Sequence, residues 1–72
     1  MSQDTNLKLQ KIMNTQQFEN LSIEKVKDYT YELEDFSLKK KWQVVLSGNH
    51  YKKFINTIDG WKFIEKGSAR KV

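Results

Sequence analysis

Hydrophobic and polar residues alternate along two stretches in the middle of the chain. Apolar residues occupy every second position of residues 42–46, and residues 29–34 show the same period of two. This period, in segments rich in β-branched and aromatic residues, is typical of strands. We therefore expect two strands that pair as a hairpin through residues 35–40. A helix that continues through Leu33 and Phe36 is the alternative for the first stretch.

A different period follows the second of these stretches. Four apolar residues have relative spacings of 0, 3, 4 and 7, which places them on one side of a helix: Tyr51, Phe54, Ile55 and Ile58. Asn49 is suited to cap the start of this helix, and Gly60 is suited to end it in a left-handed conformation. Residues 61–65 alternate again and predict a further strand.

Helical intervals also precede the first strand. Apolar residues recur in this way between Thr15 and Asp28, and either Thr15 or Ser22 is suited to cap the start. We therefore expect one helix between Thr15 and Asp28. Residues 7–13 are expected to form a short amphipathic turn or a segment that docks on the core.

Together these elements predict an α+β fold in the order α-β-β-α-β. The sheet is expected to be small and antiparallel, with about three strands, and to pack on one or two helices through the apolar side of residues 51–58. Residues 15–66 would form a single compact domain. Residues 1–14 would be a loose or weakly docked segment, and residues 67–72 a basic tail.

Composition restricts the class of protein. Of the 72 residues, 38% are hydrophobic and 31% are charged, which is typical of a small globular domain. The absence of cysteine excludes disulfides and thiolate metal sites. Residues 44–46 are the longest apolar run, too short to span a bilayer, and residues 1–6 lack the pattern of a secretory signal. We therefore expect a protein of the cytoplasm, or of a host cell's cytoplasm, with no membrane partner.

Catalytic chemistry has few candidates in this chain. His50 is the single histidine, and Ser47 has no recognisable orienting acid or oxyanion donor beside it. Glu32 and Glu34 share one side of a predicted strand. Two solvated carboxylates are a simpler interpretation of this pair than a cation site. The glycines are isolated, so no phosphate-binding glycine loop is present. The sequence therefore predicts a binding protein, not an enzyme, with no cofactor and no metal.

Charge is divided along the chain. Residues 1–36 carry four lysines and seven acids, a net charge of −3, whereas residues 37–72 carry nine bases and two acids, a net charge of +7. Clustered bases attract polyanions, and an exposed aromatic ring beside them would stack on an unpaired base. The leading hypothesis is electrostatic binding of DNA or RNA. The predicted nucleic-acid-binding residues are Lys39, Lys40, Lys41, Lys52, Lys53, Arg70 and Lys71.

Other interpretations of the same features stay open. The two charged halves could meet as a solvated surface, and Trp42 and Trp61 are expected inside a core this small. Alternatively, the acidic half could dock on a larger host protein, as small inhibitors or adaptors of phages and mobile elements do. The alternative protein-binding residues are Tyr29, Tyr31, Glu32, Glu34, Asp35 and Phe36. A homodimeric structural module is a further possibility, because association would enlarge the core.

Overall fold

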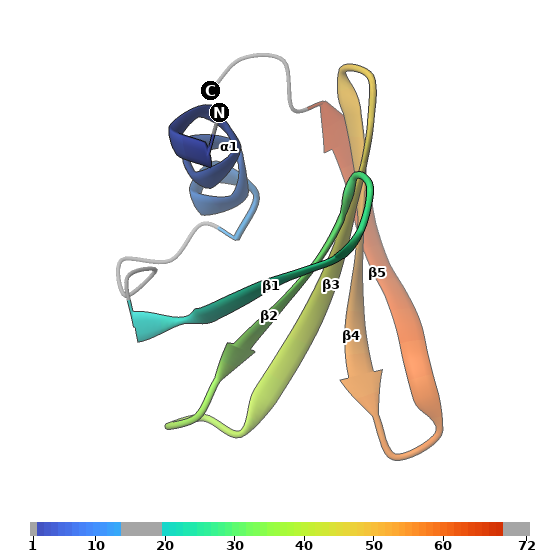
Figure 1. The fold of residues 1–72 in the computed structure, drawn as a ribbon. Helices are drawn as coiled ribbons and strands as arrows, with labels where there is room; N and C mark the ends of the chain where they lie inside the picture. Colours follow the sequence, from blue (N-terminus) through green and yellow to red (C-terminus); the bar gives the residue numbers. More distant parts are fainter. Residues whose placement is uncertain (1, 14–19, 69–72) are drawn as a thin grey trace.

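The chain folds as one N-terminal helix followed by a five-stranded antiparallel sheet (Figure 1). The computed structural model describes residues 2–13 and 20–68. The elements are α1 (Ser2–Met13), β1 (Ser22–Lys27), β2 (Thr30–Asp35), β3 (Lys40–Ser47), β4 (His50–Thr57) and β5 (Gly60–Ser68). Over these described ranges, no helix has the length and apolar character needed to cross a membrane.

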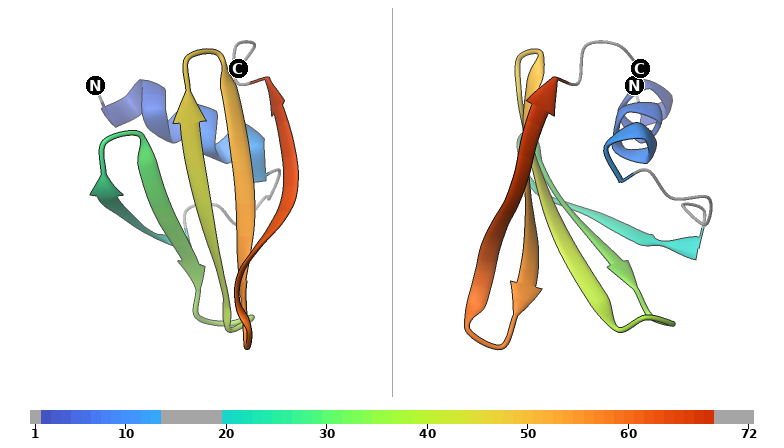
Figure 2. Two further views of the ribbon diagram at one scale, coloured as in Figure 1. Left: turned by 90° about the vertical axis from the view of Figure 1, so that its right-hand side faces the viewer. Right: turned by 180° about the vertical axis from the view of Figure 1, so that it is seen from behind.

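The sheet is a meander, in which each strand pairs with the next strand of the sequence. The expected α-β-β-α-β order with three strands is therefore wrong, because the fold is mostly β. α1 lies against one face of the twisted sheet, which we call the inner face, and leaves the opposite, outer face uncovered (Figure 2). The β1–β2 and β3–β4 turns lie at one end of the sheet, and the other two turns lie at the far end (Figure 1).

The strands expected from period-two alternation are confirmed. β2 and β3 form the expected hairpin, with Leu33 opposite Trp42. The connecting turn is stabilised by Asp35, whose Oδ1 accepts a hydrogen bond from the backbone N–H of Leu38 at 3.0 Å. β5 contains the strand expected over residues 61–65.

The helix expected over residues 51–58 is wrong, because most of this segment belongs to β4. Gly48 adopts a φ of 59°, a conformation that glycine reaches without strain, and forms a tight turn with Asn49. β4 then pairs with β3 along almost its whole length. Hydrogen bonding to a neighbouring strand thus decides the conformation of a segment whose apolar spacing also suits a helix.

The apolar residues of this segment do not share one side. Tyr51 and Ile55 lie on the inner face, whereas Phe54 lies on the outer face. Ile58 lies in the β4–β5 turn, where the residue is 99% exposed. The expectation that these four residues form one apolar side that packs on the sheet is therefore wrong.

The helix expected between Thr15 and Asp28 is also wrong in the part that the structure describes. Residues 22–27 form β1, an edge strand that places Ile23 opposite Leu33 of β2. Pairing with β2 overrides the helical spacing of the apolar residues, because propensity is weaker than tertiary context. The start of this predicted helix falls on residues 14–19, which lie outside the described residues.

The hydrophobic core lies between α1 and the inner face. Among the described residues, its buried apolar side chains are Leu9 and Ile12 of α1, Leu33 of β2 and Val44 of β3. Half-buried side chains pack around them: Met13, Leu21, Ile23, Tyr31, Leu46 and Tyr51. Since half of the buried apolar side chains come from α1, the inner face depends on this helix for its burial.

A polar network joins the last turn of α1 to the inner face. The Nζ of Lys53 donates a hydrogen bond to the backbone carbonyl of Ile12 at 3.0 Å and lies 3.6 Å from the carboxylate of Glu65. Carbonyls in the last turn of a helix lack helical donors and carry partial negative charge, so the ammonium group caps them. The hydroxyl of Tyr51 donates to the same carboxylate at 2.6 Å. This hydrogen bond, then burial, then the carboxylate's charge raise the pKa of Tyr51 to about 12.

Candidate nucleic-acid interface

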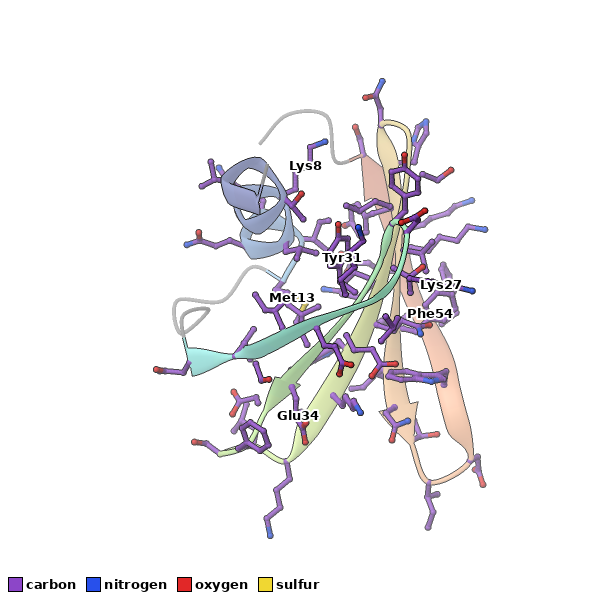
Figure 3. All side chains as sticks on the ribbon, viewed as in Figure 1. Lys8, Met13, Lys27, Tyr31, Glu34 and Phe54 are labelled. Atoms are coloured by element: carbon purple, nitrogen blue, oxygen red, sulfur yellow. The ribbon has the colours of Figure 1, made fainter. Side chains whose placement is uncertain are left out.

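The direction of the β4 side chains follows from the position of Lys53. Lys53 contacts α1, and side chains alternate along a strand, so Lys52 and Phe54 point to the outer face. Residues opposite each other on neighbouring strands share a face, which adds Lys66 opposite Lys52 and Phe63 opposite Phe54. Figure 3 shows Phe54 on the side of the sheet away from α1.

The outer surfaces of β4 and β5 combine aromatic and basic side chains. We call this set the aromatic–lysine strip: Lys52, Phe54, Trp61, Phe63 and Lys66. Phe63 and Lys66 share a face although they are three positions apart, because β5 contains a bulge with Ile64 as its extra residue. Trp61 lies opposite Asn56, two positions beyond Phe54 along β4. The bulge therefore aligns the rings and the lysines in one strip.

The rings of the strip are open to solvent. Phe54 and Phe63 pack edge to face, with ring centroids 5.7 Å apart and an interplanar angle of 69°. Phe63 is 50% exposed and Trp61 is 39% exposed. The expectation that Trp61 lies in the core is therefore wrong, whereas Trp42 is half-buried on the inner face. Exposed rings on a sheet are the platforms on which unpaired bases stack.

The two lysines of the strip face each other directly across β4 and β5. Like charges in this position repel, and none of the carboxylates whose side chains the structure describes forms an ion pair with Lys52 or Lys66. A hollow of about 410 Å³ lies beside them and is also bordered by Ser47 and His50. The position thus offers two ammonium groups and an imidazole to an anion.

The charge division of the sequence becomes a division across the sheet, because strand order follows sequence order. β1 and β2 direct three carboxylates outward: Glu24, Glu32 and Glu34. The lysines of the strip lie on the opposite side of the outer face, on β4 and β5. Lys27, at the end of β1, departs from this division and lies on the same side of the sheet as Phe54 (Figure 3). An anion on the outer face would therefore be drawn toward β4 and β5.

The predicted nucleic-acid-binding residues do not gather on one surface. Lys39 lies in the β2–β3 turn with a φ of 56°, and Lys40 and Lys41 begin β3 at the same end of the sheet. Lys52 lies near the opposite end of the outer face, beside the β3–β4 turn. Lys41 also forms an ion pair with Glu32 at 3.3 Å.

The remaining predicted bases are separated from these. Lys53 is 8% exposed and points to α1, so it faces away from its neighbour Lys52. Arg70 and Lys71 lie outside the described residues. Among the described members of the predicted set, only Lys52 belongs to the aromatic–lysine strip.

The alternative protein-binding residues are also divided by the fold. Glu32 and Glu34 point outward, whereas Tyr31 lies on the inner face, as does Asp35, which caps the β2–β3 turn. The other two are exposed in turns at opposite ends of the sheet: Tyr29 and Phe36. The structure therefore does not assemble this set into one surface.

Four residues of the strip were not predicted as site residues: Phe54, Trp61, Phe63 and Lys66. A signal for them exists in the sequence. If residues 50–57 are interpreted as a strand, Lys52 and Phe54 fall on one face and Lys53 on the other. The placement of Lys66 depends on the bulge in β5, which no residue pattern marks.

Comparisons of this chain with protein-family models, with curated proteins and with solved structures found no match. What the protein binds is therefore inferred from the chemistry of the aromatic–lysine strip.

Proposed function

We propose that this protein binds single-stranded DNA or RNA on the outer face of β4 and β5, and that it catalyses no reaction. The supporting observation is the facing pair of Lys52 and Lys66 beside the exposed rings of Phe63 and Trp61. Phosphates would relieve the repulsion between the two lysines and release counterions. Bases would stack on the rings of Phe63 and Trp61. Because every base has a flat aromatic face, little sequence preference is expected.

Single strands suit this surface better than a duplex. A paired base hides its faces within the stack, whereas an unpaired base exposes them to aromatic side chains. α1 packs on the inner face, so it is not free to enter a major groove as recognition helices do. We therefore expect weaker binding to a duplex of the same length.

The test is a titration of fluorescently labelled single-stranded oligonucleotides, followed by anisotropy. Each lysine–phosphate contact contributes a slope of roughly −0.7 to the dependence of log affinity on log salt for single strands. Two such contacts predict a slope of about −1.4, which is roughly a sevenfold loss of affinity between about 50 and 200 mM salt. Absence of binding at the lower salt, or binding that does not change with salt, would refute the proposal.

Variants of the strip separate its two components. Lys66→Gln is expected to reduce the slope by about 0.7. Phe63→Leu is expected to weaken binding at every salt concentration without changing the slope, because stacking carries no charge. Lys39→Gln is the matched control, since it removes an equal charge at the far end of the sheet. If the control lowers affinity as much as Lys66→Gln, binding follows net charge and not the strip.

A second candidate function is docking on a larger protein through the far end of the sheet. The β2–β3 turn exposes Phe36 and Leu38, and the β4–β5 turn exposes Ile58 at the same end. Exposed apolar side chains at one end of a sheet suit a protein contact. This candidate predicts one stoichiometric protein that stays bound after nuclease treatment, is lost on Phe36→Ser and Ile58→Ser substitution, and is retained by Lys66→Gln.

A further inference from the structure

A cleft opens between α1 and the inner face, at the end of the sheet that carries the β1–β2 and β3–β4 turns. Its volume is about 450 Å³, within the range of small-molecule sites. Tyr29, Tyr31 and Leu46 contribute rings and an aliphatic wall, and Lys8 and Thr5 of α1 contribute an ammonium group and a hydroxyl. Figure 3 shows Lys8 directed from α1 toward the sheet, above Tyr31. The cleft thus combines flat apolar surfaces with a positive charge.

Tyr29 is an unusual residue for the turn in which it stands. Its φ is 65°, in the left-handed region that bulky side chains rarely adopt. Tyr29 as a whole is 67% exposed, so burial of its side chain contributes little to stability. Its carbonyl accepts a hydrogen bond from the backbone N–H of Leu46 at 2.8 Å, a role that any residue fulfils. Neither the turn nor the core explains a tyrosine here, whereas the cleft does, because Tyr29 lines it.

We propose that this cleft binds a free nucleoside monophosphate. The base would stack on the rings of Tyr29 and Tyr31, and the ammonium group of Lys8 would contact the phosphate. Hydroxyls of Thr5 and Ser47, which also line the cleft, supply hydrogen bonds. This site is independent of the proposed function, because the cleft and the aromatic–lysine strip lie on opposite faces of the sheet.

Three probes test which parts of the ligand are recognised: AMP, adenosine and inorganic phosphate. Each is titrated into the full chain while the backbone amide resonances of Tyr29, Leu46 and Gly48 are followed by NMR. Saturable shifts are expected with AMP, weaker binding with adenosine, and no saturable shifts with phosphate. The proposal is overturned if AMP gives no saturable shifts, or if adenosine binds as tightly as AMP.

Substitutions at Tyr29 separate a ligand-binding role from a structural one. Asparagine tolerates the left-handed conformation, so Tyr29→Asn is expected to leave the thermal midpoint unchanged or raised. The same variant should bind AMP at least about fivefold more weakly, the lower range for loss of a base–aromatic stack. Tyr29→Phe keeps the ring and should retain the affinity. A Tyr29→Asn variant that binds AMP normally, or that loses stability in parallel with affinity, contradicts the proposal.

Substitutions of lysine locate the phosphate. Lys8→Met is expected to weaken binding of AMP but not of adenosine, whereas Lys11→Met, an exposed control on α1, should change neither. Lys66→Gln on the outer face should leave AMP affinity unchanged, and loss of AMP binding in that variant would overturn the cleft site. Binding of AMP without binding of oligonucleotides would refute the proposed function alone, and the reverse result would refute the cleft site alone.

Discussion

Replacing Lys53 with methionine is expected to destabilise the protein, because Lys53 connects α1 to the sheet. Its Nζ donates to the carbonyl of Ile12 at 3.0 Å and lies 3.6 Å from the carboxylate of Glu65. Methionine has a similar length and can keep the apolar contacts of the lysine stem. The loss is therefore confined to the ammonium group, and the Ile12 carbonyl loses its donor.

The magnitude follows from the two contacts. A hydrogen bond from a charged donor contributes about 1.5–3 kcal/mol. The ion pair adds only about 0–1 kcal/mol, since the Glu65 side chain is 44% exposed. Relief of the desolvation of Lys53 offsets part of this sum, which leaves an expected loss of about 2 kcal/mol. A domain of this size has roughly 3–5 kcal/mol in total, so the variant would retain about half of its stability.

Urea unfolding followed by circular dichroism measures this loss. With a slope of about 1 kcal/mol per molar urea, the midpoint should fall by roughly 2 M. Lys52→Met is the matched control, because it removes the adjacent lysine from the outer face and should change stability by less than about 0.5 kcal/mol. Equal midpoints for the two variants would refute the role assigned to Lys53. Oligonucleotide binding should distinguish the variants in the reverse way. Lys52→Met should lower the salt dependence of binding, whereas Lys53→Met should leave it unchanged.

Three further changes follow from the same contacts. Leu9→Ala, at a fully buried position of α1, should lower the free energy of unfolding by about 2–5 kcal/mol, measured in urea. Ile58→Ser should change the urea midpoint little, because the Ile58 side chain makes almost no contact; a large loss of stability would contradict its position in the turn. The pKa of Tyr51 is raised to about 12, so its protonated hydroxyl stabilises the folded state. This contribution is complete below pH 10, the ordinary pKa of tyrosine, and is lost as pH rises toward about 12. Tyrosinate absorbance should show this late titration, and Glu65→Gln should shift it to lower pH; an unchanged titration would exclude the hydrogen bond as its cause.

The sequence predicts the strands whose local pattern and tertiary environment agree. β3 alternates, is rich in β-branched and aromatic residues, and places Val44 in the core, so propensity and burial favour the same conformation. β2 likewise places Leu33 inward between outward glutamates. For these strands, the residues that face the core are those that the alternation selects.

β4 was mispredicted because its period is ambiguous. Both faces of β4 hold apolar residues, with Tyr51 and Ile55 inward and Phe54 outward, and the resulting intervals coincide with one side of a helix. The buried residue between them is Lys53, which binds a helix carbonyl instead of solvent. In most half-buried strands the apolar residues face the core and the charged residues face solvent, and β4 reverses this pattern at Lys53 and Phe54. The contact of Lys53 with α1 and the contact of Phe54 with Phe63 of β5 explain the reversal.

The same reversal explains why the candidate site was predicted only in part. Net charge indicates that the second half of the chain is basic, but it does not show which lysines point outward. Lys52 and Lys53 are adjacent in sequence and carry equal charge, yet one faces solvent and the other supports α1. Lys66 joins Lys52 only because a bulge changes the side-chain alternation within β5. The direction of each lysine side chain depends on the register of the strands, which cannot be derived from composition or net charge.

Within residues 2–13 and 20–68, no element packs on the outer face of the sheet. One twelve-residue helix covers one side of the sheet, and among the described residues the buried apolar core consists of four side chains between them. Burying Phe63 and Trp61 would contribute more to stability than Val44 does, because aromatic side chains have larger apolar areas. Their exposure adds nothing to the stability of the fold, and the repulsion between the two facing lysines opposes it. The proposed ligand would cover the rings with a flat apolar group and the lysines with an anion. A single-stranded nucleic acid presents both groups in every nucleotide.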